Sequence, residues 1–237
     1  MKKRIAAALA LGVSLMMSTT ALAGTWVDAY GDGAYWKYQN DDGTMAENTW
    51  VESDGKWYYM GAYGDMMKCG VTPDNCLVGK DGVWNGARLD SYDVLDEDAA
   101  AAYEKIVQTS YNILDYYLFD ADQDGTPELF VRRGTCEADY MFYVYTYNGD
   151  RAVQIGSFDG GHGGLCTTRD GKLYREYAHM GVFGLCSLTW DGTTFAYNPE
   201  SLFEEFVTEG NGYEDIMARM GVYDLWSYSG SDLTPFN

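Results

Sequence analysis

Acidic side chains between Asp120 and Glu128 are spaced for metal chemistry. Three aspartates occupy alternate positions, a glycine follows the third, and a glutamate stands three residues beyond that glycine. Calcium loops need carboxylates at alternate positions, a glycine at the tight turn and a backbone carbonyl directly after it. The spacing therefore predicts calcium as a cofactor. The predicted ligands are Asp120, Asp122, Asp124, the carbonyl of Thr126, and Glu128.

This loop resembles an EF-hand loop but departs from that pattern at two positions. Val131 stands at the twelfth position, where a bidentate glutamate belongs, so we expect an affinity on the order of 10⁻⁴–10⁻³ M. Pro127 favours an extended Thr126, so the loop should run into a strand, as in the helix–loop–strand variants found in exported bacterial proteins. The alternative is an acidic turn that aspartate side chains stabilise by hydrogen bonds without a metal.

A short segment rich in aromatic residues and glycine repeats itself near the N-terminus. Thr25–Asp28 (TWVD) returns as Thr49–Glu52 (TWVE), and Asp32–Tyr38 (DGAYWKY) returns as Asp54–Met60 (DGKWYYM). Asp81–Trp84 (DGVW) begins a third, incomplete copy. A period of about 20 residues, with two short strands and a glycine turn in each copy, predicts stacked β-hairpins.

These copies resemble the cell-wall-binding, choline-binding-type repeats of Gram-positive surface proteins, with the best match from Trp50 through Met66. The resemblance implies that aromatic faces hold a quaternary ammonium group by cation–π attraction or stack on flat sugars. The implied partners are a cell-wall polysaccharide, a teichoic-acid-type polymer or another glycan. The alternative is that the rings only pack the hairpins together. The implied ligand-binding residues are Trp50, Trp57 and Tyr58, completed by Tyr35 and Trp36 of the preceding copy.

The chain has two histidines, His162 and His179, and both have a glycine within two residues in the sequence. A histidine can transfer protons or bind a metal, here with Glu137 or Asp139 as an acidic partner. The sequence contains no serine-nucleophile or zinc-protease motif beside them. These four residues are therefore either catalytic candidates or, in the alternative, structural residues of turns.

Five cysteines in a chain with an export signal predict disulfide bonds with one thiol left over. Cys69 and Cys76 flank a Pro-Asp-Asn turn, so we expect them to pair. Cys166 and Cys186 lie on segments that we expect to be neighbouring strands, and they form the second expected pair. Cys136 is then unpaired, or it replaces one member of the second pair.

Residues 1–23 have the pattern of a secretion signal. A basic start precedes an apolar run from Ile5 to Met17, and Ala21-Leu22-Ala23 fits a cleavage site. We expect cleavage after Ala23. A membrane anchor is the alternative, although the apolar run is shorter than the about 20 residues that a span needs. No later segment is apolar enough, so the exported protein is predicted to have no membrane span.

The chain carries 36 acidic residues against 16 lysines and arginines, which gives a formal net charge of −20. Removal of the first 23 residues, which include basic but no acidic residues, increases the acidic excess. Such a surface repels nucleic acid and anionic membranes, so we exclude nucleic acid as a partner. It suits divalent or organic cations, or it serves solubility alone.

Several elements must position these residues. Leu89–Asp96 has the composition of a linker, and apolar residues at three- and four-residue steps predict a helix over 97–117. Short apolar segments joined by glycine turns predict an antiparallel meander after it. The expected strands are 129–133, 140–147, 152–158, 165–168, 172–177, 182–190 and 194–197. Two further helices are expected at 199–209 and 213–220.

These elements predict an α+β fold class, with stacked, solenoid-like β-hairpins followed by an antiparallel sheet and flanking helices. The expected parts are a signal peptide (1–23), the repeats (24–89) and an α+β domain (90–237). Residues 117–194 resemble a domain of exported proteins from anaerobic Gram-positive bacteria, without a nameable activity. We expect a secreted protein of the cell wall or cell surface, whose repeats hold a calcium-stabilised domain at the envelope. A wall-targeted hydrolase and an adhesin-like interaction protein are the alternatives.

Overall fold

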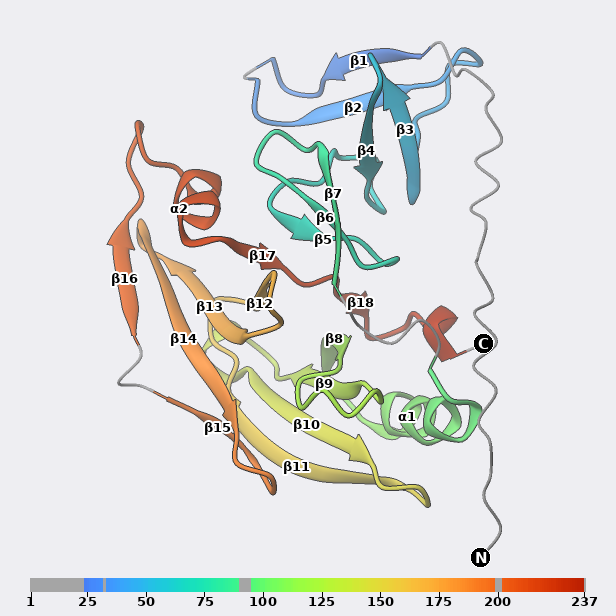
Figure 1. The fold of residues 1–237 in the computed structure, drawn as a ribbon, viewed down its shortest axis with the longest axis vertical. Coiled ribbons are helices and arrows are strands. Elements are labelled where there is room, and N and C mark those ends of the chain that lie inside the picture. The colour runs from blue at the N-terminus through green and yellow to red at the C-terminus, as the bar shows by residue number, and fades with distance from the viewer. Residues whose placement is uncertain (1–23, 32, 90–94, 199–201, 237) are drawn as a thin grey trace, which may run out of the picture.

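The computed structural model describes residues 24–31, 33–89, 95–198 and 202–236. The molecule is elongated, with β-hairpins stacked at one end and a large curved sheet with helix α1 (Glu97–Thr109) at the other (Figure 1). The expected signal segment and most of the expected linker lie outside the described residues. None of the described helices combines the length and the hydropathy that a membrane span requires.

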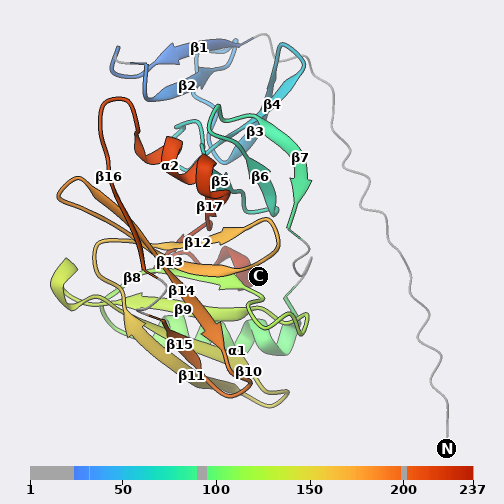
Figure 2. The ribbon, with the colours of Figure 1, turned by 60° about the vertical axis from the view of Figure 1, so that its left-hand side comes forward.

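The N-terminal repeats fold as hairpins that lie one above another in both views (Figures 1 and 2). The first pairs β1 with β2, the second pairs β3 with β4, and the third unit joins β5, β6 and β7, all antiparallel. These strands are β1 (Thr25–Asp28), β2 (Trp36–Gln39), β3 (Thr49–Ser53), β4 (Lys56–Met60), β5 (Gly70–Val71), β6 (Cys76–Val78) and β7 (Trp84–Arg88).

Local sequence explains how the second hairpin forms. Asp54 and Gly55, which join its strands, both have positive φ angles of 51° and 73°. Two such residues make the turn whose twist matches paired strands, and Asp-Gly is a preferred sequence for it. The hairpins share a small core in which Tyr38, Val51 and Met60 are buried. The predicted stack of hairpins is therefore present.

The remaining strands form one sheet with the third unit of the repeats. Its order is β18-β8-β9-β10-β11-β15-β14-β13-β12-β17-β5-β6-β7, and β16 pairs with β14 beside this path. Neighbours are antiparallel except for the pairs β11–β15 and β17–β5. The strands are β8 (Ile113–Phe119), β9 (Glu128–Arg133), β10 (Met141–Tyr147), β11 (Ala152–Asp159), β12 (Leu165–Thr168), β13 (Leu173–His179), β14 (Val182–Trp190), β15 (Phe195–Tyr197), β16 (Phe203–Phe206), β17 (Val222–Asp224) and β18 (Tyr228–Ser229).

The sheet curves around the main hydrophobic core. Side chains from β8 through β15 meet there, with Phe130 and Phe142 completely buried. Val71, Leu77 and Leu89, which belong to the repeats in sequence, enter the same core. The third repeat copy is thus continuous with the C-terminal sheet by hydrogen bonding and by packing. The domain boundary predicted near residue 89 stays a prediction.

Helices cover the outside of the sheet at two places. Tyr103 and Val107 of α1 pack with Tyr116, Leu129 and Val131, on the face of β8 and β9 opposite to the main core. Helix α2 (Tyr213–Met220) packs on β14 and begins where Asp215 accepts a hydrogen bond from the Gly212 N–H at 3.1 Å. Two short 3₁₀ helices, η1 (Glu137–Asp139) and η3 (Thr234–Phe236), complete the described elements.

The predicted helix over 97–117 is too long by about two turns. Helix α1 starts as expected, because Asp96 caps it by accepting from the Asp98 and Ala99 N–H groups at 3.0 and 3.3 Å. It ends at Thr109, and Asn112 then has a φ of 56° before β8 begins. Because β8 is buried on both faces, its run of apolar residues carries no strict alternation and is equally compatible with a helix.

The predicted helix over 199–209 is wrong over its described part. Residues 203–206 form β16, which pairs with β14 from Phe203↔Leu185 to Phe206↔Val182. The edge of β14 offers backbone groups that need partners, and this long-range pairing outweighs the local apolar spacing. The helix over 213–220 is confirmed, and so is each of the seven predicted strands, within one or two residues at the ends.

The described chain is mostly β, with α1 and α2 as its two α-helices. The α+β prediction is therefore confirmed only in outline. The predicted glycine turns are present, since Gly149, Gly171 and Gly192 have φ angles of 87°, 78° and 92°. Such angles favour glycine, so glycine positions in the sequence correctly predict these turns.

All five cysteines are free, so both predicted disulfide bonds are wrong. Cys69 and Cys76 lie at opposite ends of the β5–β6 hairpin, where Cys69 is opposite Gly79 and Cys76 is opposite Thr72. Three residues of strand separate these ends by about 10 Å. A disulfide needs Cα atoms about 4.4–6.8 Å apart.

Strand β13 separates the second predicted pair. Cys166 on β12 lies opposite Tyr174 of β13, and Tyr174 lies opposite Ser187 of β14. Two strand spacings of about 4.8 Å keep Cys166 and Cys186 beyond disulfide distance. Cys136, the predicted odd thiol, is exposed, whereas the other four cysteines are buried.

We expect one of the five thiols to react with a soluble thiol reagent in the folded protein. Burial raises the pKa of Cys69 to about 12 and that of Cys76 to about 11, so these thiols stay protonated as well as covered. Reagent titration of native protein should count one thiol, and Cys136→Ser should remove it. Denaturation without reductant should then expose five in the parent, whereas a count of one would contradict the absence of disulfides.

Candidate functional site

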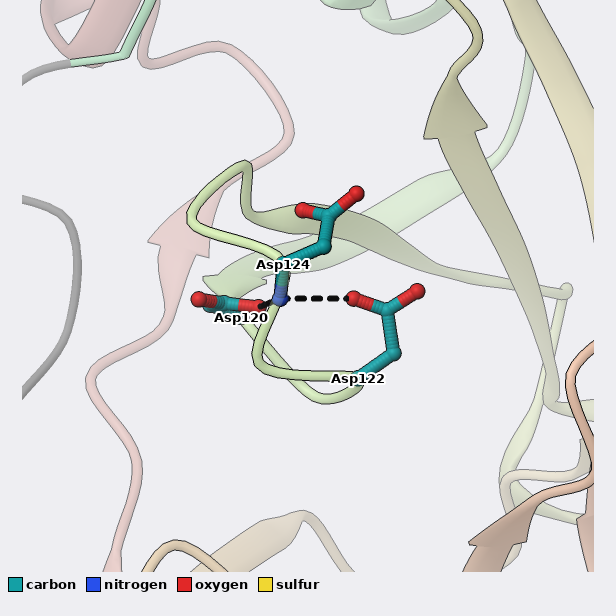
Figure 3. A group of neighbouring side chains, drawn as sticks. All are labelled: Asp120, Asp122 and Asp124. Atoms are coloured by element: carbon teal, nitrogen blue, oxygen red, sulfur yellow. Dashed lines mark hydrogen bonds between the residues drawn. The ribbon is translucent and has the colours of Figure 1, made fainter.

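The loop between β8 and β9 gathers the three predicted aspartates (Figure 3). One ligand atom from each of Asp120, Asp122 and Asp124 lies within 4.8 Å of the other two. Calcium binds oxygen atoms at about 2.3–2.6 Å, so two oxygens on one ion lie up to about 5 Å apart. The carboxylate spacing therefore fits an ion of that size.

Hydrogen bonds within the loop hold these carboxylates in place. The Asp124 N–H donates to Oδ1 of both Asp120 and Asp122 at 3.1 Å, as the dashed lines in Figure 3 show. The Gly125 N–H donates to Asp120 Oδ2 at 3.0 Å, and Gly125 has a φ of 92° that a side chain would strain. Burial, and then the charges of Asp124 and Asp120, raise the pKa of Asp122. A bound cation would relieve that repulsion.

Glu128, predicted as a ligand, is not one of the carboxylates that converge within 4.8 Å. It is completely buried, and it accepts hydrogen bonds from the Ala121 N–H at 3.0 Å and the Thr146 hydroxyl at 3.1 Å. Burial is the main cause that raises its pKa to about 8, with a contribution from Asp122. In this conformation Glu128 supports the loop through its hydrogen bond with the Ala121 N–H.

The remaining part of the loop is tied to helix α1. The Thr126 N–H donates to Asp124 Oδ1 at 2.7 Å. The Tyr103 hydroxyl donates to the Pro127 carbonyl at 2.8 Å. The loop runs directly into β9, as the proline predicted. Helix, loop and strand are therefore coupled through buried contacts.

The aromatic repeats show the same contact between successive copies twice. Trp26 of the first copy packs on Tyr58 of the second, with ring centroids 4.9 Å apart, and its indole N–H donates to the Ser53 hydroxyl at 3.1 Å. Trp50 of the second copy packs on Trp84 of the third, with ring centroids 6.1 Å apart. Its indole N–H donates to Asp74 Oδ2 at 3.1 Å. Each tryptophan thus uses its ring and its polar N–H to join its copy to the next one.

The predicted ligand-binding rings divide between two faces of the second hairpin. Trp50 pairs with Tyr59 across the strands, and Glu52 pairs with Trp57, so Trp50 and Trp57 share one face. Tyr58 pairs with Val51 on the opposite face, toward Trp26.

The rings predicted from the first copy lie apart from that face. Tyr35 is 52% exposed and packs on Tyr30, and the Trp36 indole N–H donates to the Gly33 carbonyl at 3.0 Å. Within the described residues, no ring contact joins Tyr35 or Trp36 to Trp50.

Sequence reasoning missed the rings that contact Trp50 directly or through Tyr59. The ring centroid of Trp50 lies 5.3 Å from that of Tyr59 and 6.1 Å from that of Trp84. The ring centroid of Trp226 lies 5.8 Å from that of Tyr59. Trp84 was visible as part of the third copy, where the Asp-Gly-x-Trp pattern returns. Trp226 follows β17 and carries no repeat signal, so only the fold places it here. We call Trp50, Tyr59, Trp84 and Trp226 the ring cluster.

The fold brings together three of the four residues considered for catalysis. His162 and His179 stack with ring centroids 4.0 Å apart, and His162 Nδ1 lies 2.8 Å from Glu137 Oε2. Asp139 points elsewhere, since it accepts from the Thr135 and Cys136 N–H groups at 2.7 and 2.9 Å. Among the described residues, neither histidine side chain bonds a hydroxyl or thiol, so no nucleophile–base pair is formed.

Comparison with known families identifies the repeats. The model of the choline-binding repeat matches residues 44–84. The choline-binding domain of Spr1274 from Streptococcus pneumoniae is 34% identical over 26% of this chain and 70% of that domain, with a TM-score of 0.22. This chain therefore contains a choline-binding repeat, the class of cell-wall-binding module that the sequence resembles.

A second solved structure covers more of the chain at lower identity. It is the modular Cpl-1 endolysin in complex with a peptidoglycan analogue, 14% identical over 79% of this chain and 39% of that one, with a TM-score of 0.23. This chain thus spans well under half the length of the endolysin. No curated protein matches the chain in sequence.

We expect Glu128→Ala to lower the free energy of unfolding by about 2–4 kcal/mol, because it leaves the Ala121 N–H and the Thr146 hydroxyl without their buried acceptor. Glu128→Gln should cost less, since its amide retains an oxygen acceptor of the same reach. Denaturant melts of both variants, beside Glu209→Ala at an exposed position, measure this. Equal free energies of unfolding for Glu128→Ala and Glu209→Ala would show that Glu128 does not stabilise the fold.

Proposed function

We propose that the choline-binding repeat holds this protein at the bacterial cell wall by binding a polymer that carries quaternary ammonium groups. The ring cluster is the proposed binding site. Cation–π attraction favours a quaternary ammonium group that lies against several aromatic faces, most strongly those of tryptophan. Three tryptophans and a tyrosine form a chain of ring contacts, Trp84–Trp50–Tyr59–Trp226, and each of the three tryptophans remains partly exposed.

A carboxylate supports the choice of a cationic ligand. Asp74 accepts the Trp50 indole N–H at 3.1 Å and so lies at the edge of the ring cluster. A negative charge beside aromatic faces adds direct attraction for a cation. The equivalent contact one copy earlier has Ser53 in the place of Asp74, without a charge. We therefore assign the cation to Trp50 and not to Trp26.

The other predicted rings have secondary roles in this proposal. Trp57 shares the hairpin face of Trp50 and extends the site along the strand. Tyr58 joins copies through Trp26. Tyr35, which is exposed, and Trp36 offer surfaces on which the sugars of a wall polysaccharide can stack.

We propose further that calcium stabilises the sheet through Asp120, Asp122 and Asp124. The spacing of the carboxylates and the raised pKa of Asp122 support this proposal. Bound calcium would fix the loop to which α1 is tied through Tyr103. The ion would then have a structural role, and the whole would be a secreted protein held at the envelope.

The binding prediction uses the full chain from Gly24, because β5 of the repeats pairs with β17. Trp50→Ala and Trp84→Ala should each weaken binding to Gram-positive wall material by ~0.5–2 kcal/mol, through the loss of one aromatic face. Sedimentation of protein with purified walls measures the bound fraction. Free choline in the buffer should release the parent protein.

Tyr63→Ala is the matched control, because Tyr63 is 83% exposed and lies outside the ring cluster. Each variant is compared only after its melting curve shows a folded protein. Tryptophan variants that bind like the Tyr63 control would show that the rings only pack the hairpins. Release by soluble glycans but not by choline would move the specificity from the ammonium group to sugars.

Calcium should raise the melting temperature in proportion to the logarithm of its concentration, because only the folded loop gathers the ligands. At ten times the dissociation constant the gain is about 1.4 kcal/mol, or roughly 3–6 °C for a chain of this size. Thermal melts with chelator and then with millimolar calcium measure it. Magnesium should substitute poorly, because it demands a tighter octahedral shell.

Asp122→Asn combined with Asp124→Asn should abolish this response and leave a folded protein, since the change also removes charge repulsion. Asp150→Asn, at an exposed turn, is the matched control and should keep the full response. If melts of the parent are identical with chelator and with calcium, the loop is an acidic turn only.

A further inference from the structure

A polar pocket of about 270 Å³ lies within the C-terminal sheet, and no residue of the ring cluster or of the aspartate loop lines it. Its walls come from β8, β9, β13 and β17 and from the glycine segment before β12. Besides Asp115 and Arg132, which pair with each other, two carboxyl groups line it, Glu176 from β13 and Asp224 from β17. They are 48 residues apart in sequence, so the fold alone brings them together.

Both carboxyl groups contact the same hydroxyl. Tyr213 of α2 donates to Glu176 Oε2, and its oxygen also lies 3.1 Å from Asp224 Oδ1. A tyrosine hydroxyl has one proton, so it can donate to one carboxylate only. The second carboxyl group must then bring its own proton, or it lies uncompensated against the first. Burial raises the pKa of both groups, and Glu176 raises that of Asp224 further.

The cations near this pair are already engaged. Arg132 donates to both oxygens of Asp115, through Nε at 2.9 Å and through a terminal nitrogen, and also to the Gly163 carbonyl. Arg175 pairs with Asp159 at 2.9 Å. Among the described residues, no lysine or arginine forms an ion pair with Glu176 or Asp224. The pocket therefore has an excess of negative charge.

A tyrosine hydroxyl faces the same space. Tyr117 is only 4% exposed and lines the pocket, yet its hydroxyl has no hydrogen bond to any described residue. A Cβ added to Gly164 would lie 3.0 Å from the Tyr117 oxygen and 3.5 Å from Glu176 Oε1. The hydroxyl and the carboxylate therefore border one small volume, which stays open because Gly164 has no side chain. The Tyr117 hydroxyl is therefore free to bond a ligand in the pocket.

We propose that this pocket, which we call the amine pocket, binds a protonated primary amine, with Glu176, Asp224 and Tyr117 accepting its three N–H groups. An ammonium group supplies the missing positive charge and three donors at once. A quaternary ammonium group has no N–H and is recognised by aromatic faces, so the two proposed sites select different ligands. A divalent cation fits this pocket less well. Among the described residues, three or more possible metal ligands lie close together only at the aspartate loop.

The proposal does not depend on wall binding, and the amine can belong to a free small molecule or to the side chain of a larger one. Two probes separate these sources. Ethanolamine represents the free amine, and N-acetyl-lysine-amide represents an amine at the end of a side chain. Choline is the matched probe without N–H donors, and ethylene glycol is the matched probe without charge.

Isothermal titration of the full chain from Gly24, in calcium-free buffer, tests the amine pocket. Ethanolamine should bind at one site in the millimolar range, and choline should show no heat at that site in the Trp50→Ala background. Tyr117→Phe should weaken ethanolamine binding about tenfold, because it removes one hydrogen bond to a charged group. Gly164→Ala should weaken it by at least as much, since the added methyl occupies the ligand's space.

Tyr223→Phe is the control, because Tyr223 precedes Asp224 on β17 and does not line the pocket. This variant should bind ethanolamine as the parent does. If Gly164→Ala does not fold, Tyr117→Phe still decides. Absence of ethanolamine binding to folded protein overturns the proposal. So does equal binding by Tyr117→Phe and the parent, or displacement of ethanolamine by calcium in the Asp122→Asn, Asp124→Asn variant. Binding of the lysine derivative but not ethanolamine supports the site and assigns it to a side-chain amine.

Discussion

A two-stranded hairpin buries too little apolar surface to be stable by itself in water, and the N-terminal repeats of this protein depend on how that constraint is met. Each copy places a tryptophan on the next one, Trp26 on Tyr58 and Trp50 on Trp84. The last copy has no following hairpin, so it pairs with β17 and sends Leu77 into the main core. The stack is thereby completed by the C-terminal sheet.

The same constraint limits what the rings can do as a binding site. A ring that packs between copies has one face committed to burial, and only the remaining exposed surface is free for a ligand. Trp50 shows both demands, since its N–H is bound by Asp74 and its ring lies between Tyr59 and Trp84. Trp226 adds a ring from outside the repeats. Binding and stability are therefore coupled in this cluster, and every ring variant has to be judged with its melting curve.

Negative charge is the second organising feature. The aspartate loop and the amine pocket both hold carboxyl groups close together. At the pocket, the nearby Arg132 and Arg175 are already paired with other carboxylates. Repulsion between such groups costs free energy unless a cation or a proton lies between them. The loop presents three carboxylates at the spacing of a metal ion, whereas the pocket presents two with a tyrosine hydroxyl. This difference in donor sets is the reason that we assign a metal to one and an ammonium group to the other.

Short-range patterns in the sequence determined the hairpin repeats, the glycine turns, the strands from β9 to β15 and the aspartate loop. Each of these depends on residues a few positions apart, whose backbone angles and side-chain spacing are set locally, as with Asp54-Gly55 and Asp120–Asp124. Tertiary structure alone decided that 113–119 and 203–206 are strands, because their partners lie far along the chain. It also kept Cys166 from Cys186 by inserting β13, turned Glu128 inward, and brought Glu176, Tyr213 and Asp224 to one point. Long-range pairing and burial carry no local spacing signal, which is the physical reason that these features could not be predicted.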